Sequence, residues 1–152
     1  MIGDEINCLK NFGHMQLNNA RSHCQSLKAS QILPRSRKES DDLVSALLSL
    51  DLSLEDGKVL VSIGIRKTME GEWLDSAGQL STGYHFNWLP NKPDNLGGNQ
   101  SYAGFRVDGL NTTARWDTYN GTEELNVVCT KTAGHGKDYS LLFISWIKRK
   151  VQ

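Results

Sequence analysis

The chain has 152 residues, and its 17 Lys and Arg residues balance its 17 Asp and Glu residues to a net charge of zero. This length suits one domain with a sizeable hydrophobic core. The charge balance gives no basis for binding nucleic acid, and no apolar run reaches the roughly 18 residues of a membrane-spanning helix. Residues 1–5 carry two acids and lack the apolar segment of a signal peptide.

Two helical patterns come first along the chain. The first lies in residues 17–27, where apolar side chains recur at helical spacing. These side chains are Leu17, Ala20, Cys24 and Leu27. A second helix is predicted to begin at a cap formed by Ser40 and Asp41. Its apolar face consists of Leu43, Val44, Leu47, Leu48 and Leu50.

Short β-branched and aromatic runs then replace the helical pattern. The predicted strands are residues 59–65, 72–75, 102–107, 114–117 and 125–129. A stretch rich in Gly, Asn and Pro separates two of them, from Ser76 to Ser101. A connection this long inside a compact domain is typically functional. Helices followed by strands predict an α+β fold with an antiparallel sheet.

The end of the chain has no evident place in this sheet. We therefore predict a domain over residues 1–131 and a tail outside it over residues 132–152. The tail is interpreted as a linker or as the product of an incomplete gene model.

Cysteines and potential glycosylation sites bear on the compartment. Cys8, Cys24 and Cys129 are an odd count, with no Cys-x-x-Cys pair and no His at ligand spacing, which argues against a zinc site. Asn-x-Ser/Thr acceptor sequences occur at Asn99, Asn111 and Asn120. Together they favour an extracellular, oxidising setting, secreted or on a cell surface. The competing interpretation is ordinary polar loop composition.

Several motifs appear in an order that resembles the C-type lectin-like domain, over roughly residues 8–131. The first helix carries a Cys at position 24, and the strand at 61–65 takes the place of the family's Trp-Ile-Gly-Leu strand. Further matches are Trp73-Leu74-Asp75, Asn87-Trp88, Pro90, Lys92-Pro93-Asp94, Trp116-Asp117 and Cys129. The resemblance implies the C-type lectin-like fold, with two helices, an antiparallel sheet and a long loop region.

The resemblance also implies the disulfide pattern. It pairs Cys24 with Cys129, joining the first helix to the last strand. The family's second bridge is missing, because Ser101 or Tyr102 stands where one cysteine would be and Gly121 lies near the other position. Cys8 resembles half of an additional N-terminal bridge, and without a partner it is expected to be a free thiol.

In sugar-binding members of the family, a Glu-Pro-Asn or Gln-Pro-Asp triplet in the long loop supplies two side-chain oxygens to calcium. Here Lys92 and Asp94 take those places. Asn99 or Gln100 stands for a later acid, and Asp117 with Thr118 for an Asn-Asp pair. An ammonium has donors and no acceptor, so Lys92 is expected to pair with Asp94 or Asp117 where the ion would sit.

The candidate ligand-binding residues are therefore Lys92, Asp94, Asn95, Asn99, Gln100 and Asp117. Of these, Asp94, Asn99 and Asp117 are the candidate metal ligands, for a calcium ion that binds weakly or not at all. No other cofactor is expected. No catalytic motif is present, neither Gly-x-Ser-x-Gly, nor a P-loop, nor His-Glu-x-x-His.

Three functions follow from this pattern. The first is recognition of a glycan or protein partner without calcium. The second is a calcium-dependent lectin of the galactose type, because Pro93-Asp94 echoes Gln-Pro-Asp and Asn91 or Asn95 could replace the oxygen lost at Lys92. The third is a structural module of a larger cell-surface or secreted protein. The fold alone does not choose among them.

Overall fold

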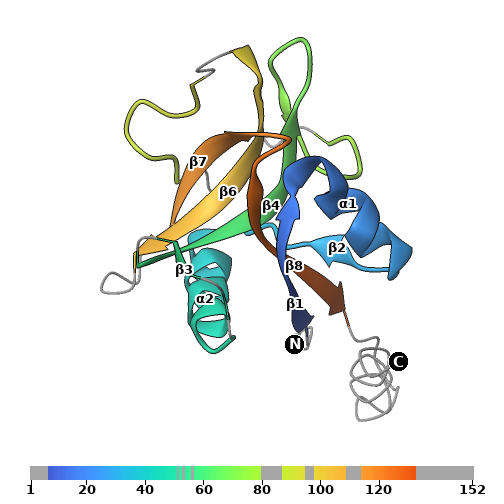
Figure 1. Ribbon diagram of the computed structural model, residues 1–152, viewed down its shortest axis with the longest axis vertical. Helices are drawn as coiled ribbons and strands as arrows, with labels where there is room; N and C mark the ends of the chain where they lie inside the picture. The colour runs from blue at the N-terminus through green and yellow to red at the C-terminus, as the bar shows by residue number, and fades with distance from the viewer. Residues whose placement is uncertain are drawn as a thin grey trace.

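The computed structural model describes residues 7–50, 52, 54–55, 57–79, 87–94, 98–108 and 114–132. Within them, two helices flank one twisted sheet (Figure 1). The helices are α1 (Leu17–Ser26) and α2 (Arg37–Leu48). The strands are β1 (Asn7–Gln16), β2 (Ser30–Gln31), β3 (Leu54–Glu55), β4 (Lys58–Lys67), β5 (Trp73–Leu74), β6 (Gln100–Asp108), β7 (Arg115–Asn120) and β8 (Glu124–Thr132).

The sheet has the strand order β1-β8-β4-β6-β7, with β2 paired to β8 and with β3 and β5 paired to β4. The first and last of the described strands pair antiparallel, Asn7 opposite Thr132. The expected antiparallel sheet is in fact mixed, because β4 meets β8 in parallel at Val61 and Asn126. The buried Asn126 side chain donates to the Leu60 carbonyl at 3.1 Å, which ties these two strands together.

Helix α1 matches its prediction, with Leu17, Ala20 and Cys24 buried. Its N-terminus has no side-chain cap. Instead, the turn between β7 and β8 supplies backbone acceptors, with Leu17 N donating to Glu123 O and Asn18 N to Gly121 O. Main-chain carbonyls thus satisfy helix donors that would otherwise need a cap.

The predicted start of α2 is wrong. Ser36 is the N-cap, and its Oγ accepts from Glu39 N at 3.1 Å. The Glu39 carboxylate reaches back to the Arg35 N–H at 2.8 Å, a variant of the capping box. Ser40 and Asp41 lie inside the helix, and Ser40 is buried because it faces the core. The apolar face is as predicted at Val44 and Leu47, which are both buried.

The five predicted strands are present, most of them longer than expected, and β1, β2 and β3 are additional. Strand β1 carries a register irregularity between Asn11 and His14. Gly13, with a positive φ of 77°, lies in that irregularity, and its N–H donates to the Asn11 side chain. The strand owes its place to pairing with β8 rather than to an apolar pattern of its own.

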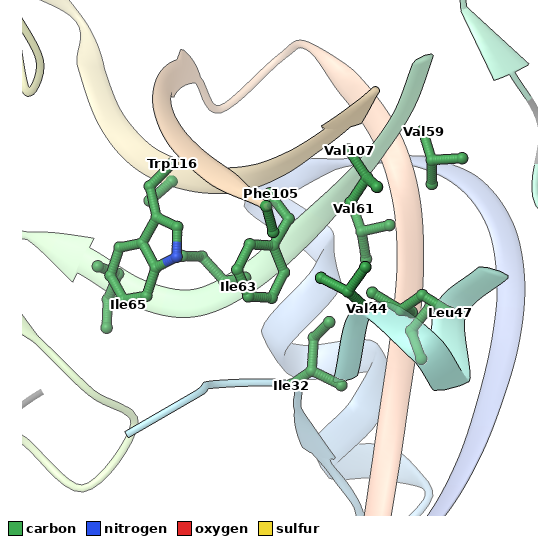
Figure 2. Packing of buried hydrophobic residues seen from close by; sticks show 13 residues of the cluster. Ile32, Val44, Leu47, Val59, Val61, Ile63, Ile65, Phe105, Val107 and Trp116 are labelled. Carbon is green, nitrogen blue, oxygen red and sulfur yellow. The ribbon is translucent and has the colours of Figure 1, made fainter. Parts of the chain in front are cut away.

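The main core fills the space between α2 and strands β4, β6 and β7. Figure 2 shows it extending from Trp116 and Phe105 to Val44 and Leu47 of α2. Trp116 is fully buried and meets the Phe105 ring edge to face at 6.0 Å. The predicted disulfide is formed, with the Cα atoms of Cys24 and Cys129 5.5 Å apart in a second cluster under α1. The Cys8 side chain lies outside the described residues.

Candidate functional site

The candidate site forms where residues 87–94 lie against β7 (Figure 1). Trp88 makes a parallel bridge with Trp116. On either side of it, Trp116 N donates to Asn87 O and Leu89 N donates to Trp116 O, each at 2.8 Å. The Asn87 side chain donates to Ala114 O at 2.7 Å. The segment is therefore fixed to β7 by backbone and side-chain hydrogen bonds together.

Aromatic packing secures the same junction from the core side. The Trp88 ring lies edge to face with Trp116 at 5.5 Å and contacts Trp73 at 5.2 Å. The three indoles form a continuous series of ring contacts from the fully buried Trp116 through Trp88 to Trp73, the latter two being partly buried. Such pairs add to the hydrophobic gain of burial.

A tight turn follows the bridge and brings two charged side chains to β7. Lys92 N donates to Leu89 O at 3.0 Å across the turn. Asn91 within it has a positive φ of 63°, which Asn tolerates better than most residues. The peptide between Lys92 and Pro93 is cis. Lys92 and Asp94 follow and face Asp117 of β7.

The Lys92 ammonium lies between two carboxylates. Its Nζ is 2.7 Å from Asp94 Oδ2 and 3.2 Å from Asp117 Oδ1. The predicted ion pair is thus formed with both acids. The three side chains are only 21%, 35% and 20% exposed, respectively. The hydrogen bond to Asp94 raises the pKa of Lys92 above its ordinary value. Partial desolvation of the ammonium opposes this rise, and the interaction with Asp117 adds to it.

Thr118 connects this pair to β6. Its hydroxyl lies 3.0 Å from Asp94 Oδ1 and 2.7 Å from Gln100 Oε1. One hydroxyl carries one proton, so it donates to one of these acceptors at a time. The Thr118 N–H donates to Asp117 Oδ1 at 2.7 Å. We call Lys92, Asp94, Gln100, Asp117 and Thr118 the charged network.

The other predicted site residues lie elsewhere. Of the two alternatives for the later acid position, Gln100 reaches the network, whereas Asn99 is exposed just before β6. Asn95 and the potential glycosylation site Asn111 lie outside the described residues. The role of Thr118 as a link was not predicted, although its position after Trp116-Asp117 could have indicated it.

The family follows from sequence comparison. The sequence profile of the lectin C-type domain matches residues 13–131. The chain belongs to the C-type lectin domain family. Domains of this family are generally non-enzymatic binding modules, and the family assignment confirms the resemblance and the fold class predicted above. A search of curated proteins found no match.

Solved C-type lectin structures share the fold. The C-type lectin CEL-I from Cucumaria echinata superposes with a TM-score of 0.68 at 16% identity, covering 85% of this chain and 92% of that chain. The carbohydrate-recognition domain of mouse scavenger receptor C-type lectin superposes with a TM-score of 0.66 at 18% sequence identity. The match covers 86% of this chain and 92% of that chain. The carbohydrate-recognition domain of cow CD23, solved in the presence of an oligosaccharide, superposes with a TM-score of 0.61 at 22% sequence identity. The match covers 84% of this chain and 89% of that chain.

The donor set does not fit the calcium ion that sugar-binding C-type lectins use. Calcium takes six to eight oxygen ligands, whereas the network offers two carboxylates, an amide and a hydroxyl around an ammonium. Among the described residues, no three or more His, Cys, Asp or Glu side chains form a group that could hold a metal. Lys92 supplies the positive charge between the acids instead.

The place of the missing second disulfide is filled by packing. A Cβ atom added to Gly121 would come within 2.7 Å of the Tyr102 ring. The guanidinium of Arg66 lies 5.0 Å from the same ring centroid on the β4 side. Tyr102 thus packs against the turn between β7 and β8. In the family pattern, a disulfide would join these two places instead.

We therefore expect Gly121→Ala to destabilise the domain by about 1–3 kcal/mol, because overpacking displaces the Tyr102 ring. Urea unfolding would measure the loss. As control, the double variant Gly121→Ala/Tyr102→Ala should lose less than the sum of the two single changes, since removing the ring removes the clash. Additive losses would contradict a direct contact.

Proposed function

We propose that this C-type lectin domain is an extracellular recognition module that binds a glycan or protein partner without calcium. The observation that supports it is the position of the Lys92 ammonium between Asp94 and Asp117. Membership of a family of binding modules supports the general class. No helix in the described part of the chain is long and apolar enough to cross a membrane.

Electrostatics supports calcium independence. A divalent ion about 4 Å from a lysine ammonium is repelled by on the order of 8 kcal/mol at an effective dielectric constant of about 20. Lys92 could turn outwards to avoid this repulsion, but it would then break its bonds to Asp94 and Asp117. Calcium would gain only two carboxylates from that exchange, too few to replace most of its hydration.

The network offers a partner both signs of charge. Asp94, Asp117 and Gln100 present acceptor oxygens, and Lys92 presents donors on a half-buried side chain. Sugar hydroxyls or peptide groups can hydrogen-bond to such a mixed set without a metal. The bridge to Trp116 fixes the segment that carries Lys92 and Asp94, so these groups are held in place before a ligand arrives.

A galactose-type calcium-dependent lectin is the second candidate. The sequence Pro93-Asp94 and the convergence of Asp94, Asp117 and Gln100 favour it. Carbohydrate-recognition domains among the structural neighbours are consistent with it, although their identities below 25% support the fold alone. The third candidate function is a structural role within a larger cell-surface or secreted protein.

Thermal unfolding with and without calcium separates the first two candidates. Millimolar calcium should change the stability of the wild-type domain by less than roughly 0.5 kcal/mol, because a ligand whose concentration does not exceed its Kd stabilises the native state only slightly. Lys92→Glu places a third carboxylate in the network. We expect this variant to melt at lower temperature with chelator and to gain several degrees on addition of calcium.

Lys38→Glu is the matched control. It makes the same charge change on an exposed side chain of α2, so calcium should leave its melting temperature unchanged. Strong stabilisation of the wild-type domain by calcium would contradict the proposal and favour the galactose-type lectin. Calorimetric titration with galactose and mannose, with calcium or chelator, then reports the ligand. Absence of binding to any glycan or protein probe would favour the structural role.

A further inference from the structure

Asn99 and Asn120 occupy one corner of the sheet, beside the charged network. Each is followed two residues later by a hydroxyl residue, Ser101 or Thr122, which makes both potential acceptors of an N-linked glycan. Asn99 directly precedes β6, and Asn120 is the last residue of β7. Gln100 pairs with Asn120 across the antiparallel ladder. The two acceptor sequences are therefore neighbours in space.

The two acceptors differ in their place relative to the paired strands, because Asn120 lies within β7 and Asn99 lies before β6. Successive side chains of a strand point to opposite faces, so Asn120 lies on the same face of β7 as Thr118, about 7 Å along the strand. The Thr118 hydroxyl contacts Asp94 and Gln100 of the network. Asn99 precedes β6, is exposed, and has no pairing partner in the ladder between β6 and β7. Asn120 is therefore on the face that carries Thr118, and it lies directly opposite Gln100, a second residue of the network.

The turn after Asn120 engages its side-chain oxygen and its backbone N–H. Asn120 Oδ1 accepts from Thr122 N at 3.1 Å and lies 3.3 Å from Thr122 Oγ1. The backbone N–H of Asn120 donates to Glu123 Oε2 at 2.6 Å. These bonds use the amide oxygen and the backbone, not Nδ2, the atom to which an N-linked glycan is attached. Thr122 and Glu123 are exposed.

We propose that Asn120 carries an N-linked glycan that covers the charged network and restricts which ligands reach it. The inference rests on the extracellular setting of the proposed function. In the transfer, Nδ2 of Asn120 bonds to C1 of the first sugar of a lipid-linked oligosaccharide pyrophosphate. The bond from C1 to the pyrophosphate oxygen breaks, the lipid pyrophosphate leaves, and Nδ2 loses a proton.

The first measurement is modification itself. The full chain is expressed through a secretory pathway as wild type, Thr122→Ala and Thr122→Ser, and glycopeptides are identified by mass spectrometry before and after enzymatic release. A glycan is expected at Asn120 in the wild type and in Thr122→Ser, which keeps the acceptor sequence, and its loss is expected in Thr122→Ala. An unmodified Asn120 in the secreted wild-type protein would overturn the proposal.

The second measurement is access to the network. A bulky amine-reactive ester is applied to the same proteins, and its rate of reaction at Lys92 is read by peptide mass mapping. Lys92 should react several-fold faster in Thr122→Ala than in Thr122→Ser. Lys38 on α2, whose side chain is 85% exposed, should react equally in both. Equal rates at Lys92 would show that the glycan does not cover the network.

Ser101→Ala tests the assignment to Asn120. It removes the acceptor sequence at Asn99, and Lys92 should then react as slowly as in the wild type. Faster reaction in this variant would place the covering glycan at Asn99 and overturn the proposal. None of these readouts requires calcium or a bound ligand, so a failure of the proposed function would appear separately, in the melting and titration experiments.

Discussion

Replacing both Cys24 and Cys129 by alanine should lower the free energy of unfolding by about 4–5 kcal/mol. The bond links residues 105 positions apart, and a cross-link that closes so long a loop strongly restricts the unfolded chain. Both cysteines are fully buried, so the variant also loses two sulfur atoms from the cluster under α1. A loss this large is a substantial share of the stability of an ordinary domain.

Reduction of the wild-type protein separates the two contributions. It opens the cross-link and keeps both sulfur atoms, so its loss should be slightly smaller than that of the alanine variant. Urea unfolding in the presence and absence of reductant measures both. Non-reducing peptide mapping should recover Cys24 and Cys129 in one fragment; a fragment joining Cys8 to Cys24 would contradict the assignment.

Trp116→Ala should cost about 3–5 kcal/mol, the range for removing a buried large aromatic side chain. Trp116 is fully buried and contacts both Phe105 and Trp88. Its backbone also carries two of the hydrogen bonds that hold residues 87–94, and Asp117 follows it directly. The cavity should therefore loosen the packing under the charged network as well as the core.

Trp73→Ala is the matched control for this change. Trp73 contacts Trp88 but is only half-buried, so its loss should be clearly smaller in urea unfolding. The Lys92 ammonium offers a second readout, since its signal in nitrogen-detected NMR should move more in Trp116→Ala than in Trp73→Ala. Equal losses of stability in the two variants would contradict the central position of Trp116.

The helices show how far local sequence carries the fold. The spacing of Leu17, Ala20 and Cys24 predicts α1 because one apolar face is buried along its length. The start of α2 was missed because two hydroxyl residues compete as caps. Ser36 is the N-cap because Glu39 stabilises a helix start at this position: its carboxylate accepts a hydrogen bond from Arg35 N. A Ser-x-x-Glu pattern could have indicated this start.

Strand β1 was missed for a different reason. Its polar residues and the irregularity at Gly13 break the alternation that marks a half-buried strand. It exists because β8 offers a pairing edge more than a hundred residues later in the chain. The parallel contact of Val61 with Asn126 also depends on such distant pairing, and no local pattern predicts it.

In the candidate site too, the sequence predicts which residues gather but not all of their contacts. Lys92, Asp94 and Asp117 were predicted as one group through the resemblance to C-type lectins. That Lys92 contacts both acids depends on the turn after Leu89 and on the bridge at Trp116. The contact of Thr118 with Gln100 depends on the register of β6 against β7, which shifts between Gln100 and Tyr102. A register shift has no signature in the sequence.

The pairing of Asn7 with Thr132 determines how the domain would carry mechanical load. A force applied to these two residues would separate β1 from β8 one hydrogen bond after another, beginning at this end. The bond between Cys24 and Cys129 then transmits the tension directly from α1 to β8. Residues 25–128, which include the whole charged network, lie outside the load path, so the network would keep its arrangement while the ends of the domain are pulled.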